Sequence, residues 1–127
     1  MDVLLVAVGG ALGSVGRYWC SGLVARLFGE SFPWGTVIVN IVGSFVIGLV
    51  AALALPEGRF LLPTNARLFL MFGICGGFTT FSSFSLQTLN LLRDGEWLLA
   101  GANVSLSLVL CLLATWLGLV AGVIVNR

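Results

Sequence analysis

Four apolar segments, each long enough to cross a lipid bilayer, make up most of this chain. They cover residues 3–25, 34–55, 68–92 and 98–125, and a membrane-spanning helix needs about 20 mostly apolar residues. Only 9% of the residues are charged, whereas a soluble domain carries about 25%. The chain therefore has too few charged residues to cover the surface of a water-soluble domain. We predict an all-α membrane protein in which residues 1–127 form a single domain of four transmembrane helices.

The connections between these segments support the boundaries. Prolines, glycines and charged residues typical of loops separate the spans at residues 26–33, 56–65 and 93–96. Trp34 and Trp97 stand at the start of spans, where indole rings commonly anchor a helix at the membrane interface. The chain opens with Met1 and Asp2 rather than with a positive segment, so we interpret the first apolar stretch as a membrane helix and not as a signal peptide.

The composition excludes several classes of function. The chain contains no histidine and no lysine, which removes the usual general base and the Schiff-base nucleophile. A net charge of +1 offers no basic patch to nucleic acid. The three cysteines lie in apolar segments without a C-x-x-C pair and are interpreted as packing residues. No Asp or Glu lies near the middle of a span, which disfavours a proton-coupled exchanger. We expect neither an enzyme nor a nucleic-acid-binding protein.

One part of the third span does not suit a lipid-facing helix. Residues 73–85, GICGGFTTFSSFS, contain three glycines, five hydroxyl side chains and no charge. Glycine is a poor helix former, and hydroxyl groups compete for backbone hydrogen bonds. Irregular backbone at membrane depth is tolerated only where protein buries it or water reaches it. We therefore predict that the third helix is broken near its middle and that something is bound or conducted there.

Neutral polar residues in the spans suit an anion. Asn40 lies one turn after Thr36 in the second span, and Asn103, Ser107 and Cys111 recur every four residues in the fourth. Amide and hydroxyl groups donate hydrogen bonds to anions, and weak neutral donors replace hydration without trapping an ion. Hydrogen bonding between helices is the alternative role for each of these residues.

Three residues of the third span share one helix face, because Phe81, Phe84 and Ser85 are three and four positions apart. The edge of a phenyl ring is positive and can face an anion. Ordinary hydrophobic packing is the alternative for both rings.

The predicted break also suggests a cation site. Unwound carbonyls and the C-terminal ends of half-helices coordinate small cations such as Na⁺. Gly76 and Gly77 free the backbone, and Thr79 and Thr80 supply carbonyls. In an inverted dimer, two such breaks would share one structural ion. Arg17, deep within the first span, either extends to the interface or attracts anions into a vestibule.

The arginine residues leave the orientation of the chain undecided. Arg59, Arg67 and Arg127 share one side of a four-span chain, and Arg26 and Arg93 lie on the other, a ratio of 3 to 2. The positive-inside rule needs an excess of basic residues to set the topology. We predict that the chain inserts in both orientations and that two copies form an antiparallel homodimer in the bilayer. The alternative is that the small bias suffices for one orientation.

Taken together, three motifs resemble the Fluc (CrcB) family of fluoride channels. They are GGALGS at residues 9–14 with Arg17, WGTVIVNIVG at residues 34–43, and residues 73–85, whose T-T-F-S-x-F-S core is highly specific. The resemblance covers all four helices. It implies a dual-topology antiparallel homodimer with two fluoride pores and a central Na⁺.

The resemblance and the polar pattern together assign roles to individual residues. Gly76 and Thr79 are expected to hold Na⁺ by their backbone carbonyls, and Arg17 is assigned to the vestibule. Asn103 and Cys111 depart from the family pattern, since relatives can carry Tyr and Ser there and a thiol is a weaker donor than a hydroxyl. The expected fluoride pore comprises Asn40, Phe81, Phe84, Ser107, Thr36 and Ser85.

The resulting functional prediction is a passive channel in the inner membrane of a bacterium. It would let cytoplasmic fluoride leak out and so protect the cell against fluoride toxicity. Two other hypotheses remain: a non-conducting membrane scaffold, in which small and hydroxyl residues only pack helices, and a small-solute exchanger. A fluoride flux measurement in liposomes distinguishes the three.

Overall fold

The computed structural model describes residues 1–127 and is entirely helical. As predicted, four helical segments are long and apolar enough to cross a membrane. They are α1 (Asp2–Phe28), α2 (Trp34–Leu53), a composite third segment (Thr64–Arg93) and α6 (Trp97–Val125). The third segment begins four residues earlier than the apolar run, because Pro63 is extended and the helix starts directly after it.

The third segment is interrupted, as the sequence predicts. It consists of α3 (Thr64–Arg67), η1 (Leu68–Cys75), α4 (Gly76–Phe78) and α5 (Phe81–Arg93). In η1 the turns are wider than in an α-helix, so that the amide of Gly76 donates to the carbonyl oxygen of Met71, five residues earlier. The regular helix stops at Thr79 and Thr80, whose ψ angles of 155° and 112° are extended. The sequence assigned the freed backbone to Gly76 and Gly77, but Gly76 keeps helical angles and the break follows the glycines.

Glycines in this chain serve close helix packing. A Cβ atom on Gly9 of α1 would lie 2.7 Å from the carbonyl oxygen of Phe69 and 2.9 Å from the Cα atom of Gly73. A Cβ atom on Gly118 of α6 would clash with the carbonyl of Phe45 in α2. Small residues at crossing points let membrane helices approach closely. In this way α1 packs on η1 and α4, and α2 packs on α6.

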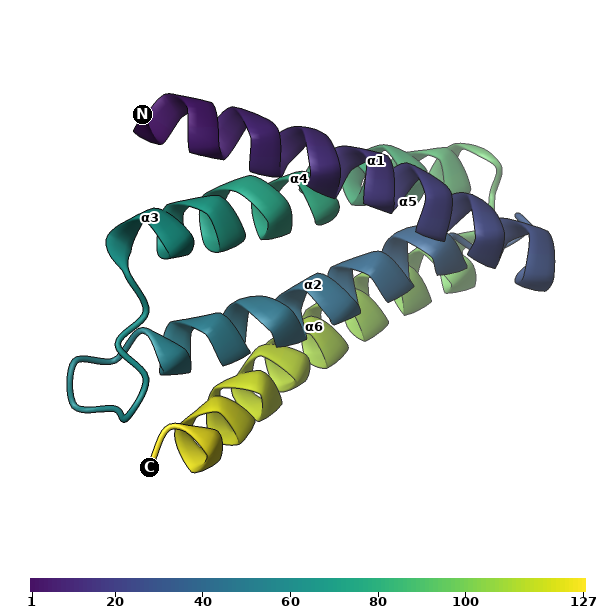
Figure 1. Ribbon diagram of the computed structural model, residues 1–127. Coiled ribbons are helices and arrows are strands. Elements are labelled where there is room, and N and C mark those ends of the chain that lie inside the picture. Colours follow the sequence, from purple (N-terminus) through teal and green to yellow (C-terminus); the bar gives the residue numbers. More distant parts are fainter.

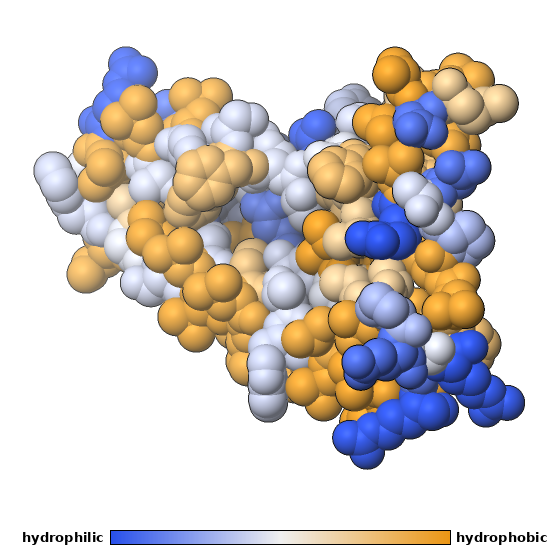
Figure 2. All heavy atoms as spheres, turned by 90° about the vertical axis from the view of Figure 1, so that its left-hand side faces the viewer, coloured by the Kyte–Doolittle hydropathy of each residue, from blue (hydrophilic) through white to orange (hydrophobic).

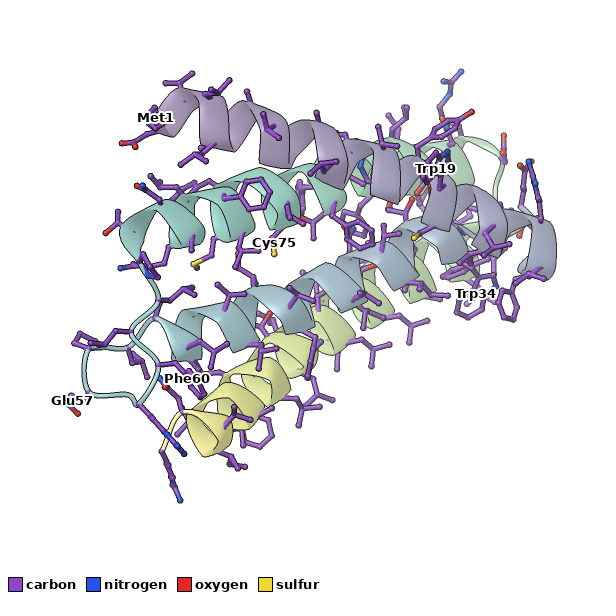
Figure 3. The ribbon with its side chains drawn as sticks, viewed as in Figure 1. Met1, Trp19, Trp34, Glu57, Phe60 and Cys75 are labelled. Atoms are coloured by element: carbon purple, nitrogen blue, oxygen red, sulfur yellow. The ribbon has the colours of Figure 1, made fainter.

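These two helix pairs form a wedge. They lie close together at the end that carries Trp19 and Trp34 and diverge toward the end that carries Met1 and Phe60 (Figure 1, Figure 3). Both termini lie at the diverging end (Figure 1). Only 20 of the 127 residues are buried, so most of the apolar surface is free to contact lipid or another chain.

Large apolar side chains cover the outside of the wedge. The space-filling view of the diverging end shows many apolar atoms among pale atoms of intermediate hydropathy, with the largest group of hydrophilic atoms at the lower right (Figure 2). A surface of this kind is stable in a bilayer and not in water. Exposed examples are Leu4, Val8 and Leu12 on α1 and Leu108, Leu112 and Trp116 on α6.

Asn126 fastens the loop between α2 and α3 to the end of α6. Its side chain is 5% exposed. The Nδ2 atom donates to the carbonyl oxygen of Ala52 at 3.0 Å, and Oδ1 accepts from the amide of Phe60. The backbone carbonyl of Asn126 also accepts from the amide of Arg59 at 2.8 Å. One buried side chain thus connects the ends of α2 and α6 with the loop that leads to α3.

Candidate functional site

Asn40 of α2 holds the extended backbone at the break. Its Oδ1 accepts from the amide of Thr80 at 2.7 Å, and its Nδ2 donates to the carbonyl oxygen of Thr80 at 3.0 Å. An asparagine amide carries two N–H donors, and the bond to Thr80 uses one of them. The second N–H of this half-buried group remains available to an anion.

Thr80 begins the helix that follows the break. Its Oγ1 accepts from the amide of Ser83 at 3.2 Å, and its hydroxyl donates to Oγ of Ser83 at 3.0 Å. A threonine in this N-cap position satisfies one of the free amides at a helix start. The N-terminus of α5, with its partial positive charge, therefore lies next to the Asn40 amide.

Arg17 connects α1 to the break. Its Nε donates to the carbonyl oxygen of Gly77 at 3.1 Å, and the half-buried guanidinium also lines the adjacent cavity. The sequence offered two roles for Arg17, at the interface or in a vestibule. The structure shows a further role: Arg17 donates to the last turn of helix before the break.

The carbonyl groups around the break fall into two sets. No side chain donates to the carbonyls of Gly76 or Thr79, and Gly76 is exposed. Free carbonyls at the C-terminal end of a half-helix suit a small cation with oxygen ligands. The donor chemistry of the two positions assigned to Na⁺ therefore fits this ion. The engaged set comprises the carbonyls of Cys75, Gly77 and Thr80, which accept from Thr79, Arg17 and Asn40.

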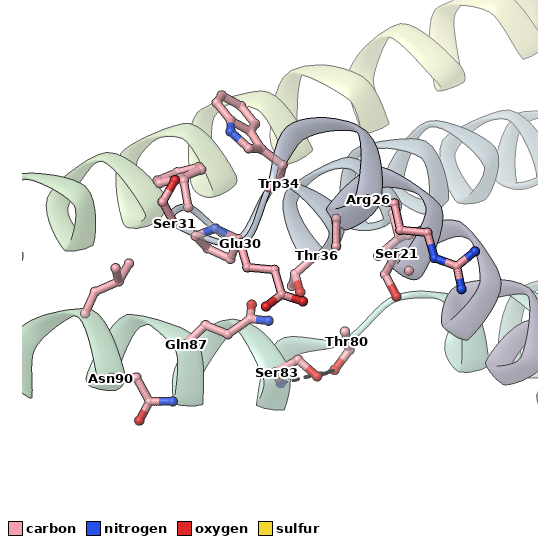
Figure 4. A pocket seen from close by; sticks show the side chains of 18 of the residues that line it. Ser21, Arg26, Glu30, Ser31, Trp34, Thr36, Thr80, Ser83, Gln87 and Asn90 are labelled. Carbon is pink, nitrogen blue, oxygen red and sulfur yellow. Dashed lines mark hydrogen bonds between the residues drawn. The ribbon is translucent and has the colours of Figure 1, made fainter. Parts of the chain in front are cut away.

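A cavity of about 1070 Å³, lined by both polar and apolar residues, opens beside the break at the end of the wedge where the helix pairs converge. Figure 4 shows Thr80, Ser83 and Gln87 of α5 along one side of it, with Ser21, Arg26, Glu30 and Thr36 on the side that faces them. Thr36 is 6% exposed. The Oε1 atom of Gln87 is buried without a hydrogen-bond partner in the protein. The cavity extends from the loop between α1 and α2 to Thr80.

The two phenyl rings predicted to line a pore lie together directly after the break. The ring centroids of Phe81 and Phe84 are 5.3 Å apart and the planes are tilted by 48°. Phe81 is 74% exposed in the single chain, and Phe84 is half-buried. Ser85 donates to the carbonyl oxygen of Phe81 at 2.9 Å, so its hydroxyl proton is used within its own helix.

The polar residues of α6 form a separate hydrogen-bonded cluster. Asn103 is 0% exposed, and its Nδ2 donates to Oγ1 of Thr88 at 2.9 Å. Ser107 is also buried, and its hydroxyl donates to Oδ1 of Asn103 at 3.4 Å. The hydroxyl proton of Ser107 is therefore engaged by Asn103, while its oxygen remains an acceptor. Cys111 makes no side-chain hydrogen bond; its carbonyl accepts from Thr115.

Residues 4–119 match the family model described as CrcB-like protein, Camphor Resistance (CrcB). This chain belongs to the CrcB family. A CrcB-family relative from Opitutus terrae is 65% identical over 97% of this chain and 93% of its own length. Relatives from Methylocella silvestris and Rhodospirillum rubrum are 57% and 58% identical over the whole chain and over 97% and 98% of their own lengths. All three are named fluoride-specific ion channel FluC. The resemblance found in the motifs is confirmed, and these names describe a channel rather than an enzyme.

Within this CrcB-family chain, the predicted site residues occupy two places. Asn40, Arg17, Gly76 and Thr79 meet at the break, where Phe81, Phe84 and Ser85 continue along α5 and Thr36 lines the cavity. Ser107 lies in the cluster of α6. The sequence reasoning missed Thr88, the partner of Asn103, because a hydroxyl at an isolated helix position carries no distinguishing pattern. It also missed the bond from Arg17 to Gly77.

Proposed function

We propose that this chain forms a fluoride-selective channel that lets cytoplasmic fluoride leave the cell passively and so protects against fluoride toxicity. The observation that carries the proposal is the name shared by relatives that are 57% to 65% identical along nearly their whole length. The chain's own residues support it, because Asn40, Phe81 and Phe84 lie at or beside a helix break that a cavity with polar lining residues reaches. We place the channel in the bacterial inner membrane as a multi-pass protein.

The proposed path offers fluoride neutral donors and ring edges. An anion that enters the cavity meets Thr36 and then the free N–H of Asn40. The edges of Phe81 and Phe84 continue the path. Ser85 and Ser107 are further contacts, each of which donates to the anion once its hydroxyl proton leaves its present partner, the carbonyl oxygen of Phe81 or Oδ1 of Asn103. None of these groups carries a charge, so each binds an anion weakly enough for it to move on.

Passive export needs no coupled proton or ATP. Hydrogen fluoride enters from acidic surroundings and ionises in the cytoplasm. One elementary charge is worth about 2.3 kcal/mol per 100 mV of membrane potential, and a negative interior drives the anion outward. The absence of an Asp or Glu near the middle of any span is consistent with this uncoupled mechanism.

We further propose an antiparallel homodimer with two pores. Phe81 and Gly76 are exposed in the single chain, although both belong to the proposed sites. In the proposed pair, a second copy packed against the break would cover them. The arginine ratio of 3 to 2 supports insertion in both orientations, which an antiparallel pair requires.

A structural Na⁺ is the expected companion of this dimer. The free carbonyls of Gly76 and Thr79 from each copy would hold it, since their neighbours Cys75, Gly77 and Thr80 are already engaged. The ion would supply positive charge for the ends of two half-helices. The chain itself contributes the backbone geometry, which Arg17 and Asn40 fix from either side.

Fluoride release from liposomes tests the proposal. Purified protein is reconstituted in vesicles loaded with potassium fluoride or potassium chloride, valinomycin is added, and efflux is followed with ion-selective electrodes. We expect fluoride efflux and no chloride efflux. Equal chloride efflux would exclude a selective channel, and the absence of any efflux would favour a scaffold. Efflux that requires a counter-substrate, and not an electrical driving force, would favour an exchanger.

A further inference from the structure

Helix α5, which carries both phenyl rings, is held to the rest of the chain at two polar points. Its start is fixed by the bonds between Asn40 and Thr80. Along its length it packs against α6, and only one side-chain hydrogen bond joins the two helices. That bond runs from Nδ2 of Asn103 to Oγ1 of Thr88. The position of α5 beyond its first turn therefore depends on this contact together with apolar packing.

The contact belongs to a continuous chain of hydrogen bonds. Ser107 donates to Oδ1 of Asn103 at 3.4 Å, Asn103 donates to Thr88 at 2.9 Å, and Thr88 donates to the carbonyl oxygen of Phe84 at 2.8 Å. The hydroxyl proton of Thr88 is used by Phe84, so its lone pair faces Asn103, and this fixes the orientation of the amide. The chain of bonds thus runs from α6 to the backbone of a residue in the proposed pore.

We propose that Asn103 and Thr88 are positioning residues for fluoride conduction: together they fix the placement of α5 and so the geometry of the Phe81–Phe84 pair. The inference rests on the proposed function. Asn103 is 0% exposed and both polar atoms of its side chain have protein partners. Like Asn40, its amide keeps a second N–H. The side chain is fully enclosed by protein, so Asn103 acts on the ion path through Thr88 and does not contact the ion. This role differs from the pore role of Ser107, to which it is bonded.

The geometry itself can be measured apart from conduction. Phe84 is replaced by 4-fluorophenylalanine, and its ¹⁹F resonance is recorded in the reconstituted protein. Thr88→Val keeps the shape of the side chain but removes the hydroxyl, and we expect it to shift or broaden this resonance. Thr88→Ser keeps the hydroxyl and is expected to restore the wild-type spectrum. Ser105→Ala is the matched control, because Ser105 is exposed on the same helix as Asn103 and makes no side-chain hydrogen bond.

Fluoride efflux is measured for the same variants without the label. An interhelical hydrogen bond in a membrane is worth about 0.6 kcal/mol, a factor of about three. We therefore expect Thr88→Val to slow fluoride efflux at least about threefold and to raise chloride leakage. Thr88→Ser and Ser105→Ala are expected to retain the wild-type rate. A role in stability alone would lower the melting temperature of Thr88→Val without changing the selectivity of the protein that remains folded.

The outcomes separate this inference from the proposed function. Wild-type efflux and selectivity in folded Thr88→Val would overturn the positioning role, whether or not the resonance moves. Where Thr88→Val does not fold, Asn103→Ser, which is too short to reach Thr88, is judged by the same criteria. If the wild-type protein releases no fluoride, the proposed function fails. The ¹⁹F spectra then still show whether Thr88 fixes Phe84, and an unchanged spectrum would overturn that claim too.

Discussion

At the scale of single residues, the amide of Asn40 replaces hydrogen bonds that a broken helix loses. Its two bonds to Thr80 satisfy one backbone donor and one backbone acceptor. A buried group left without such a partner costs about 1–3 kcal/mol. The same amide keeps one N–H free. A single side chain therefore stabilises the irregular backbone and keeps one donor free for the proposed anion path.

The first prediction concerns this amide. Asn40→Asp removes both N–H donors and introduces a negative charge beside the proposed path. Because a like charge repels the anion and the bond to the Thr80 carbonyl is lost, we expect fluoride efflux to fall at least about tenfold, or about 1.4 kcal/mol. Efflux from liposomes measures it, with Ser105→Ala as the control. A wild-type rate in Asn40→Asp would show that Asn40 does not line the path.

The second prediction concerns the exposed ring. Phe81→Ile keeps an apolar side chain on α5 but removes the positive ring edge. We expect fluoride efflux to fall at least about tenfold. The melting temperature should stay close to that of the wild type, because Phe81 is 74% exposed within its own chain and isoleucine keeps an apolar side chain toward the proposed second copy. Phe72→Ile is the matched control, since Phe72 is also exposed but lies before the break. An equal loss of fluoride efflux in Phe81→Ile and Phe72→Ile would show that the Phe81 ring serves only in packing.

The third prediction separates the two contributions of Arg17. Arg17→Gln retains an N–H donor but loses the charge that faces the cavity, so we expect efflux at low ionic strength to fall by about tenfold. The loss should shrink in high salt, because salt screens the attraction of a charge for an anion. Arg17→Lys keeps the charge but lacks the planar guanidinium that donates to Gly77. It should keep the salt dependence and lower the melting temperature. A loss in Arg17→Gln that is independent of salt would contradict the electrostatic role.

At this scale the sequence predicts residues better than their partners. Asn40 could be recognised because an amide is costly to bury in a membrane. Its partner is the backbone of Thr80, forty residues away, and no spacing rule reveals that contact. The same holds for Asn103, whose partner Thr88 follows no helical repeat with it. Local patterns identify polar groups that need a partner, whereas the fold decides which partner each one finds.

At the scale of helices, the break in the third segment has two kinds of residue with different roles: threonines that adopt the extended backbone and glycines that allow close packing. The sequence predicted an interruption from the glycines and hydroxyls of residues 73–85. Gly76 remains helical, and the extended residues are Thr79 and Thr80. β-Branched residues favour extended backbone, and Thr80 can cap the next helix through Ser83. Gly73 and Gly77, on either side of Gly76, instead allow close contact with α1. Tertiary packing sets this requirement, and the sequence alone does not display it.

The fourth prediction concerns the joint that holds α2, α6 and the loop before α3. Asn126→Ala leaves the carbonyl of Ala52 and the amide of Phe60 without partners, which should cost about 1–3 kcal/mol. We expect a lower melting temperature and faster proteolysis within residues 54–63, but an unchanged rate of fluoride efflux. Arg127→Ala serves as the control, because Arg127 is the next residue in the chain and is exposed. A loss of efflux in Asn126→Ala without a change in the melting temperature would connect this end of the molecule to the conduction path.

At the scale of the whole molecule, exposed site residues and the arginine ratio both support the proposed antiparallel pair. The chain leaves the residues of its own proposed sites at an open surface, as Phe81 and Gly76 show. The number of spans followed from length and hydrophobicity alone, and the structure agrees with it. The wedge did not follow from them, because helix crossing depends on which small residues meet, such as Gly9 with Gly73. Only the balance of charges across the loops carried information about a second copy.

The fifth prediction tests that second copy. Glu57→Lys with Thr64→Lys raises the arginine-plus-lysine ratio across the membrane from 3 to 2 to 5 to 2, whereas Phe28→Lys with Arg59→Gln and Arg67→Gln reverses it to 1 to 3. Each set should fix one orientation, since basic residues in short loops set the topology.

Chains fixed in one orientation cannot form an antiparallel pair. We therefore expect either set alone to give fluoride efflux at least about tenfold below the wild type, and the two sets expressed together to restore it. Accessibility of a terminal tag from one side of the membrane confirms the orientation of each set. Wild-type efflux from one set alone, with its tag accessible from one side only, would show that a parallel dimer or a single chain conducts. The open wedge would then be a surface for lipid and not for a second copy.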